Sequence, residues 1–265
     1  MIINKIFNKN TVEPYDMNIA IIINDNYITG SIALLNSFFA NNPGNHNIFV
    51  IFSNLNVTNI LKIRKIIKKY NSNLILKRIT TELFSKIKLS CHFTTEILYK
   101  FLIPDLIPVE YEKVLYLDSD MLVLRSLKEI YEINDYEFCA VKSIVNTEIK
   151  EYVSSINLDL DNYFNTGVIL FNLKEIHNSK NDYYIYKNYI NSNYKYLDQD
   201  IFNKINQIYN NFKILDKNYN YQIFWYSEHN NLKDIYVLHF IGDVKPWMPN
   251  YINPFKVLFN KYYKL

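Results

Sequence analysis

The sequence predicts an α/β fold in which helices cover both faces of a largely parallel sheet. Three observations lead to this prediction. Short runs of β-branched and aromatic residues alternate with segments whose apolar residues recur at helical spacing. The strand-like runs are apolar throughout, as in strands that are buried on both faces. Strand and helix follow one another in the order that is typical of nucleotide-binding domains.

The first 80 residues carry the clearest alternation. The elements predicted there are, in order, a strand at residues 18–23, a helix at 30–39, a strand at 47–52, a helix at 57–70 and a strand at 74–79. The first two strands read NIAIII and NIFVIF, so each presents apolar side chains to both faces of a sheet. The first helix has Ile32, Leu35, Phe38 and Phe39 at helical spacing and ends before Pro43, which breaks the pattern.

The helix at 57–70 alternates apolar residues with basic ones. Its basic residues are Lys62, Arg64, Lys65, Lys68 and Lys69. Because they alternate with a broad apolar face, they predict a solvated helix exterior rather than a surface for a polyanion or a membrane.

The remaining chain continues the pattern without a Ser/Gly-rich linker or an internal repeat. The elements predicted there are a helix at residues 94–106, strands at 113–117 and 163–173, helices at 182–190 and 197–208, and a strand at 236–240. Pro104 and Pro108 end the first of these helices. We therefore expect two lobes within one continuous sheet rather than two independent domains.

Composition limits the class of protein. The 265 residues carry a net charge of only +3, which is too small to argue for a nucleic-acid partner. Cys91 and Cys139 are too few for a disulfide framework or a cysteine zinc site, which favours a reducing compartment. No apolar run has the length of a signal peptide or a membrane span. We therefore expect a cytoplasmic protein.

The sharpest local feature is the segment LYLDSDMLV at residues 115–123. It places Asp118 and Asp120 one residue apart between two apolar strands. Burial of a carboxylate costs free energy on the order of several kcal/mol unless a positive partner compensates the charge. A divalent cation shared with a substrate phosphate would do so at the ligand-binding end of a parallel strand. An ordinary acidic turn is the other reading of this segment alone.

Three further segments carry polar groups that such a site needs. In LHFIGDVKPW (residues 238–247), His239 ends a strand and is followed by Gly242 and Lys245, which suit contact with a phosphate. Imidazole and carboxylates together suit manganese, with magnesium possible. The segments YLDQDIFN and YFNTGVILFNL add polar residues at a helix start and inside an apolar strand. Taken singly, these two fit a helix N-terminus and a bulge.

Together, in chain order, these four segments resemble glycosyltransferase family 8, and the similarity extends over residues 17–250. The segment that begins at Met17 and ends in the run NDNY is similar to that family's first strand and nucleotide loop. The resemblance implies a GT-A fold, which is a Rossmann-like mixed sheet with helices on both faces. It implies an N-terminal extension at 1–16, a nucleotide-binding half at 17–125, an acceptor half at 126–250 and a basic aromatic segment at 251–265.

The resemblance also implies roles for individual residues. The expected metal ligands are Asp118, Asp120 and His239; the diphosphate contacts are Gly242 and Lys245; the uridine contacts are Ile22, Asn24 and Asn26; and Asn165, Asp198 and Gln199 surround the donor sugar. Lys100, Ser119 and Thr166 complete the expected donor site. Lys100 stands where the family commonly has arginine, and Asn24 stands where close bacterial relatives often have aspartate. The Asn24 amide oxygen can still accept a hydrogen bond from uracil.

The activity implied is metal-dependent transfer of a hexose, galactose or glucose, from a UDP-sugar to a saccharide acceptor such as a bacterial surface glycan or lipooligosaccharide. The resemblance implies retention of anomeric configuration. Gln199 is expected near the sugar face where an inverting enzyme needs a carboxylate base, and an amide is a poor nucleophile. We therefore expect front-face attack by the acceptor hydroxyl, assisted by the departing phosphate, with Asp198 holding sugar hydroxyls.

Other readings stay open at this point. A phosphatase of the haloacid dehalogenase type also has Asp-x-Asp after an apolar strand, with the first Asp as nucleophile. That strand usually lies near the start of such chains, whereas here it begins at residue 113. A non-catalytic UDP-sugar-binding protein and a nucleotidyltransferase are further alternatives. The nucleotidyltransferase reading lacks a Gly-rich basic phosphate loop after the first strand.

The last eleven residues, FKVLFNKYYKL at 255–265, interleave three lysines with aromatic residues. A basic aromatic helix can lie on an anionic membrane surface. A terminal helix docked on the core explains the same pattern equally well. Peripheral contact with the inner face of the membrane would suit a glycolipid acceptor.

Overall fold

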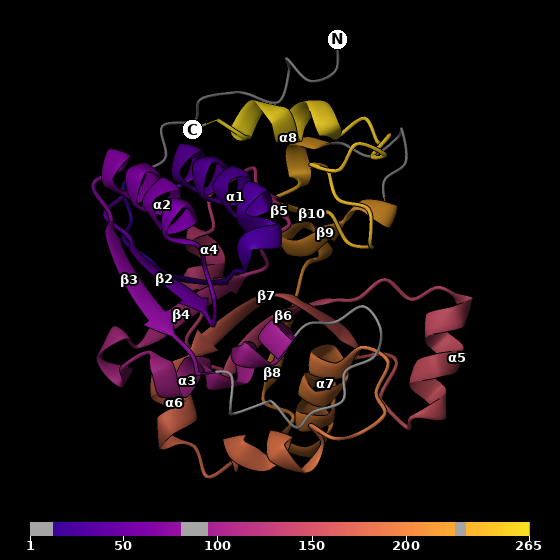
Figure 1. The fold of residues 1–265 in the computed structure, drawn as a ribbon. Coiled ribbons are helices and arrows are strands. Elements are labelled where there is room, and N and C mark those ends of the chain that lie inside the picture. Colours follow the sequence, from indigo (N-terminus) through magenta and orange to yellow (C-terminus); the bar gives the residue numbers. More distant parts are fainter. Residues whose placement is uncertain (1–12, 81–94, 226–231, 265) are drawn as a thin grey trace.

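Two β-sheets form the centre of the molecule (Figure 1), which we describe from a computed structural model covering residues 13–80, 95–225 and 232–264. The strands are β1 (Asn18–Ile22), β2 (Asn47–Phe52), β3 (Asn73–Arg78), β4 (Lys113–Leu117), β5 (Met121–Val123), β6 (Phe138–Lys142), β7 (Phe164–Asn172), β8 (Phe212–Leu215), β9 (Tyr221–Gln222) and β10 (Val237–His239). Seven strands pair in the order β3-β2-β1-β4-β7-β6-β8, and three pair in the order β5-β10-β9. Since β7 runs antiparallel to β4 and β6, the large sheet is mixed.

Helices surround the large sheet. The α-helices are α1 (Ile28–Asn41), α2 (Val57–Lys69), α3 (Ile103–Leu106), α4 (Lys128–Tyr131), α5 (Thr147–Ser155), α6 (Leu173–Asn178), α7 (Leu197–Tyr209) and α8 (Lys256–Tyr262). The 3-10 helices are η2 (Asp25–Tyr27), η4 (Thr95–Leu102), η5 (Val109–Tyr111), η6 (Tyr183–Asn188), η7 (Lys217–Asn220), η8 (Ile223–Trp225) and η9 (Leu232–Asp234). Figure 1 shows α1 and α2 on one side of the sheet and α3, α6 and α7 on the other.

Alternate side chains of the central strands pack into two separate hydrophobic cores, one on each face of the large sheet. In β1, Ile19 and Ile21 belong to the core that α1 and α2 cover, whereas Ala20 and Ile22 belong to the core that α3, α6 and α7 cover. This alternation follows from the pleat of a strand, which points successive side chains to opposite faces. The predicted α/β class with helices on both faces is confirmed.

A third core joins the small sheet to the C-terminal helix. Phe255, Leu258 and Phe259 are buried against β5, β9, β10 and one residue of α1, Ala33. Helix α8 lies beside α1 (Figure 1), and the two helices are in contact. The apolar side of α8 therefore docks on the protein core. None of the helices in the described ranges is long and apolar enough to span a bilayer.

Three sequence predictions about the elements need correction. The strands do not form one continuous sheet, because β5, β9 and β10 pair separately. The helix expected at 94–106 is a 3-10 helix, η4, followed by the one-turn α3; Pro104 lies in α3 and has no backbone N–H for an α-helical hydrogen bond. The helix expected at 182–190 is the 3-10 helix η6.

Some predictions fall on residues outside the described ranges. These are the first twelve residues of the extension 1–16, Cys91, Thr94 at the start of the predicted helix, and Leu265. The other cysteine, Cys139, is buried in β6 with a free thiol.

One edge of the large sheet gathers the segments that carry the predicted chemistry. The parallel strands β1 and β4 end there, and β7 begins beside β4, where the Asp118 N–H donates to the Gly167 carbonyl at 2.9 Å. The pairing of β6 with β7 shifts register between Ala140 and Val141, which leaves residues 166–168 of β7 unpaired to β6. Irregular pairing of this kind re-aims side chains next to functional sites.

Candidate active site

The two aspartates of the LYLDSDMLV segment lie in the short connection between β4 and β5. Asp120 is 7% exposed, and its backbone carbonyl accepts from the Phe240 N–H at 3.0 Å. Asp118 is more open, with its side chain 25% exposed. The hydroxyl of Tyr116, two residues earlier on the same face of β4, donates to Asp118 Oδ1. Both carboxylates are therefore held at the carboxyl end of a buried strand, as the sequence predicts.

His239 reaches the same point from β10, which pairs antiparallel with β5. Its Nε2 lies 3.3 Å from Asp120 Oδ1 and 3.9 Å from Asp118 Oδ2. One ligand atom from each of the three residues lies within 4.8 Å of the others. Two carboxylates and one imidazole facing each other in a mostly buried site form a donor set that fits one divalent cation.

A glycine on β7 leaves the space that the His239 ring fills. A Cβ atom at Gly167 would lie 2.5 Å from His239 Cε1 and 2.6 Å from Met121 Cε. No side chain fits there without displacing the imidazole. The glycine of the NTG segment thus has a packing reason that the sequence alone did not reveal.

Two buried lysines flank the acidic residues. Lys245 Nζ lies 2.5 Å from Asp120 Oδ2, and Lys100 Nζ lies 3.2 Å from Asp118 Oδ1 and 2.7 Å from Asp198 Oδ2. Burial alone would lower the pKa of each lysine, but the facing carboxylates outweigh it and raise both values. Burial likewise opposes ionisation of Asp120, yet Lys245 and His239 lower its pKa overall.

The residues expected around the donor sugar lie on the other side of Lys100. Asp198 and Gln199 begin α7, and Asp198 Oδ2 accepts from Lys100 and, at 2.9 Å, from the Thr166 hydroxyl. Asn165 Nδ2 donates to Gln199 Oε1 at 2.8 Å. The structure therefore brings these four predicted residues together, and Lys100 links Asp198 to Asp118.

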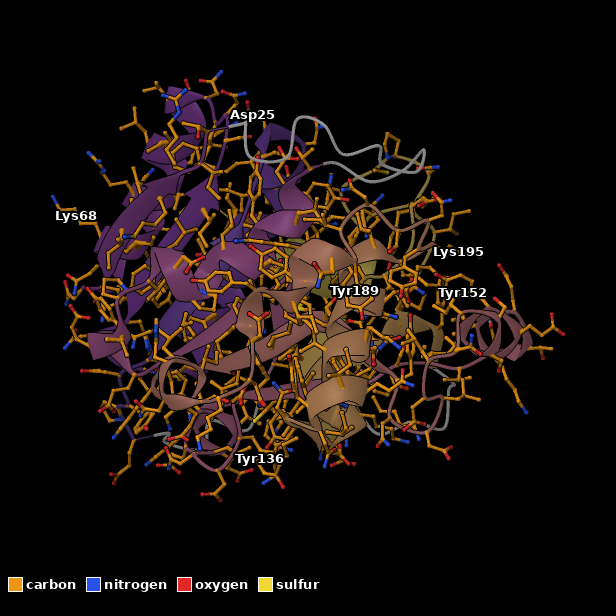
Figure 2. The ribbon with its side chains drawn as sticks, turned by 90° about the horizontal axis from the view of Figure 1, so that it is seen from below. Asp25, Lys68, Tyr136, Tyr152, Tyr189 and Lys195 are labelled. Atoms are coloured by element: carbon orange, nitrogen blue, oxygen red, sulfur yellow. The ribbon has the colours of Figure 1, made fainter. Side chains whose placement is uncertain are left out.

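Asp200 anchors the start of α7. Its carboxylate accepts hydrogen bonds from the hydroxyls of Tyr152 and Tyr163, both at 2.5 Å, and from the Tyr196 N–H at 2.9 Å. Burial raises the pKa of Asp200 to about 6. Figure 2 shows Tyr152 close to Lys195, whose backbone N–H donates to the same tyrosine hydroxyl. These contacts fix α5 and the first turn of α7, from which Asp198 and Gln199 project.

The predicted uridine contacts lie at the end of β1. The Ser119 hydroxyl donates to the Ile22 carbonyl at 2.9 Å, which ties this strand end to the acidic pair. The Asn24 side-chain oxygen accepts from the Asn26 N–H at 3.1 Å and caps η2. Asn24 is half-buried and Asn26 is exposed, so both are accessible at the edge of the site.

Gly242 lies in the loop after β10 with φ 94°, a backbone conformation that favours glycine. The nearest atom to a Cβ built there is Phe224 Cζ, at 3.4 Å. Three residues later the same loop carries Lys245, which is buried. Gly242 and Lys245, the two predicted phosphate contacts, therefore lie in one loop.

Several residues near the site were not among the predicted site residues. Tyr27 and Trp247 pack edge to face with ring centroids 5.6 Å apart, and Lys245 Nζ lies 6.0 Å from the Tyr27 ring centroid. Asn220, which is fully buried, faces His239 Nδ1 at 2.9 Å. The contact of Tyr116 with Asp118 was foreseeable, because residues i and i+2 of a strand share a face. The position of Asn220 was not, since it lies in the unremarkable run NYNYQ.

The chain resembles known glycosyltransferases over most of its length. It is 24% identical to the lipopolysaccharide 1,3-galactosyltransferase of Salmonella typhimurium, with 87% of this chain and 72% of that protein covered. It is 28% identical to the lipopolysaccharide 1,2-glucosyltransferase of Escherichia coli, with 89% and 74% covered. Among solved structures, the galactosyltransferase LgtC in complex with donor and acceptor sugar analogs superposes with a TM-score of 0.78 at 22% identity, over 93% of this chain and 95% of that one.

The likeness to LgtC supports the predicted GT-A fold. The family model for glycosyl transferase family 8 matches residues 18–250, a range that contains every residue placed in the site above. Since this match spans most of the sequence and confirms the resemblance seen in its motifs, the chain belongs to glycosyl transferase family 8.

Proposed function

We propose that this protein is a retaining hexosyltransferase that moves galactose or glucose from a UDP-sugar to a saccharide acceptor. The observation that carries the proposal is the convergence of Asp118, Asp120 and His239, which lie between the two buried lysines. The relatives support it, because they are named as galactosyl- and glucosyltransferases of lipopolysaccharide. The acceptor that we propose is accordingly a bacterial surface glycan or lipooligosaccharide.

Asp118, Asp120 and His239 would hold a divalent cation, which we propose to be Mn²⁺, with Mg²⁺ as the alternative. The fit rests on the mixed oxygen and nitrogen donors and on the space that Gly167 leaves for the imidazole. When bound, the ion would offset the negative charge that develops on the leaving diphosphate.

Lys245 and Gly242 are the proposed diphosphate contacts. Lys245 presents a buried ammonium beside Asp120 and would also donate to the phosphate oxygens of the leaving group. Gly242 has no side chain, so the backbone of its loop can approach a phosphate closely. Lys100 would hold Asp118 and Asp198 in place through its two ion pairs. It provides a point charge where an arginine would provide a planar fork.

Uridine would lie against the end of β1. Ile22, Asn24, Asn26 and Ser119 are the proposed contacts. Asn24 Oδ1 uses one lone pair on the Asn26 N–H, and its second remains for the uracil N–H.

Asn165, Thr166, Asp198 and Gln199 would surround the donor sugar. Asp198 is proposed to accept hydrogen bonds from sugar hydroxyls. Gln199 carries an amide where a carboxylate would be needed as a nucleophile or base, and an amide is a poor nucleophile. The acceptor hydroxyl would therefore attack from the face that the phosphate leaves, and the departing phosphate would take its proton.

We further propose that residues 17–125 form the nucleotide-binding half and residues 126–250 the acceptor half of the catalytic unit. We also propose that the enzyme acts in the cytoplasm, peripheral on the inner face of the membrane. The exposed side of α8 supports this placement, because Val257 is 60% exposed and the exposed residues Lys261 and Lys264 lie on or beside the same helix. Co-sedimentation with anionic vesicles of the wild type and of Lys261→Glu/Lys264→Glu, which keeps the buried residues of α8 in place, tests the membrane contact; equal recovery of both in the supernatant would reject it.

The test of the proposed activity is UDP release from a panel of UDP-sugars. We expect release from UDP-galactose or UDP-glucose that requires a divalent ion and is lost in Asp120→Asn, with retained anomeric configuration by proton NMR. Binding of UDP-sugar without turnover would instead indicate a binding protein. Phosphate release from a simple phosphomonoester, without UDP release, would indicate the phosphatase alternative.

A further inference from the structure

Asn220 connects the proposed metal ligand to the residues of the sugar site. It lies at the end of η7, is 0% exposed, and its side chain has hydrogen-bond partners at both its oxygen and its nitrogen. Its Oδ1 lies 2.9 Å from His239 Nδ1, and its Nδ2 donates to Asn165 Oδ1 at 2.8 Å. The family motifs that identify the site do not include this residue.

The direction of these hydrogen bonds is fixed by one backbone group. The Gly167 N–H donates to an Asn165 side-chain atom at 2.9 Å, and since a backbone N–H can only donate, that atom is the amide oxygen. The Asn220 atom that faces this oxygen must then be its NH₂ group. Consequently the other Asn220 atom, facing His239, is an oxygen that can only accept.

An accepting oxygen at Nδ1 determines where the ring proton resides. His239 must carry a proton on Nδ1, so in the neutral imidazole the lone pair is on Nε2. Nε2 is the nitrogen that faces Asp120 and Asp118, at 3.3 and 3.9 Å. With no acceptor at Nδ1, the other tautomer could donate from Nε2 to Asp120, and it would offer no lone pair to a cation.

The series of hydrogen bonds that starts at His239 and passes through Asn220 and Asn165 ends at Gln199. Asn165 Nδ2 donates to Gln199 Oε1 at 2.8 Å, which leaves the Gln199 NH₂ to donate to the Tyr163 hydroxyl. The same Gly167 N–H thus fixes the orientation of both the His239 ring and the Gln199 amide.

We propose that Asn220 is a positioning residue that holds the His239 tautomer with Nε2 free for the cation and, through Asn165, holds the orientation of the Gln199 amide. The proposal deepens the function proposed above and rests on it. Partners of a metal-binding histidine commonly change metal affinity by about 10- to 100-fold when they are removed.

The first test uses Mn²⁺ alone and does not depend on sugar transfer. In Asn220→Ala we expect Mn²⁺ affinity, measured by electron paramagnetic resonance, to fall by about 10- to 100-fold. Nitrogen NMR of the metal-free protein should show the His239 ring protonated on Nδ1 in the wild type and on Nε2 in the variant; loss of the signal in His239→Gln assigns it. The matched control is Asn172→Ala, another buried amide with two hydrogen bonds, at the far end of β7.

The second variant separates the two parts of the proposal and is close to isosteric. In Asn220→Asp the carboxylate still accepts from Nδ1, but its second oxygen faces Asn165 Oδ1 and repels it. Mn²⁺ affinity should then stay within about threefold of the wild type or rise, while kcat for UDP-sugar turnover falls by about 10-fold or more.

Unchanged Mn²⁺ affinity and an unchanged tautomer in Asn220→Ala would overturn the assignment to His239. An unchanged kcat in Asn220→Asp would overturn the part concerning Gln199. If the wild type bound Mn²⁺ but turned over no UDP-sugar, the proposed function would fail, and the tautomer measurement would still decide the role of Asn220.

Discussion

The two carboxylate oxygens of Asp120 contact two different basic side chains. Oδ2 meets Lys245 at 2.5 Å, whereas Oδ1 meets His239 at 3.3 Å. Removing one partner of a buried charge group leaves the others uncompensated. Asp120 therefore affects the positions of both the proposed metal ligand and the proposed diphosphate contact.

Gln199 and Asp120 should differ in their importance for turnover. In Asp120→Ala we expect metal-dependent UDP release to fall by about 1,000-fold, because the charge that organises the site is lost. In Gln199→Ala we expect a loss of less than about 100-fold, because the amide positions the sugar and does not form a bond to it. Steady-state UDP release checks both, and equal losses would contradict the different roles.

Gly167→Ala should disturb His239 directly. The added Cβ would overlap the ring and Met121 Cε, so we expect a loss of about 1–3 kcal/mol in the free energy of unfolding by urea. The control is the same change in a His239→Ala background, where only the flexible end of Met121 remains close to the added Cβ and the loss should be smaller. An equal loss in both backgrounds would show that His239 does not occupy this space.

Asp200 should give stability a pH dependence of defined sign. Burial raises its pKa from 3.8 to about 6, although the Tyr152 and Tyr163 hydroxyls act to lower it. The folded state thus binds this proton more tightly, so the contribution of Asp200 to stability is fully present below about pH 4 and falls as pH rises through about 6.

The measurement is urea unfolding of the wild type and Asp200→Asn at pH 4 and pH 7. Asparagine resembles the neutral carboxyl and does not titrate. From pH 4 to pH 7, the free energy of unfolding of the wild type should therefore fall relative to that of the variant by about 2–3 kcal/mol, at about 1.4 kcal/mol per pKa unit. A stability difference that does not change with pH would contradict the raised pKa.

At the scale of elements, the sequence predicted best where the apolar pattern was continuous. The strands β2 and β4 have the predicted bounds, and α1, α2 and α7 differ from prediction by at most two residues at each end. These segments have long apolar faces that match either a strand or a helix period. Short elements with a weaker pattern, such as β6, β8 and α5, were not predicted.

The two helices that proved to be 3-10 helices show what periodicity cannot decide. Apolar residues in the segment 95–102 recur at spacings that fit an α-turn and a 3-10 turn alike, and Pro104 then prevents continuation. In η6, aromatic packing fixes the conformation: Tyr186 stacks on Phe101 with ring centroids 4.8 Å apart, and Tyr183 stacks on Phe138 at 5.9 Å. Such tertiary contacts are not visible in the local sequence.

Helix α8 provides a matched test of docking on the core. Phe259 is 1% exposed and packs against the Phe240 and Trp247 rings, so Phe259→Ala should lower the free energy of unfolding by about 3–5 kcal/mol. Val257 on the same helix is 60% exposed, and Val257→Ala should change stability by less than about 0.5 kcal/mol. Urea unfolding of both variants measures this, and equal effects would mean that α8 is not docked as described.

At the scale of the whole molecule, the site depends on chain segments that are far apart in sequence. The aspartates come from the end of β4, His239 from β10 of the other sheet, and Asp198 from the start of α7. β5 connects the two sheets at this point, because it follows Asp120 directly and pairs with the strand of His239. Assembly of the site therefore requires both sheets to be in place.

The sequence predicted that these side chains would lie close together, but not the contacts between them. The convergence of Asp118, Asp120 and His239 was foreseeable, since strand ends and a family resemblance marked these residues. The pairing of Lys100 with both Asp118 and Asp198, and the hydrogen bonds through Asn220, depend on distances between segments that lie 18 to 98 residues apart in sequence. Patterns within one segment carry no information on such distances.

A Mn²⁺ titration, followed by electron paramagnetic resonance on the wild type, Asp120→Ala and His239→Ala, tests whether these residues share one cation. We expect one Mn²⁺ site in the wild type that each substitution weakens by at least about 10-fold, although Asp120 follows β4 of the large sheet and His239 ends β10 of the small sheet. Full Mn²⁺ affinity in either variant would contradict a single cation site shared by Asp118, Asp120 and His239.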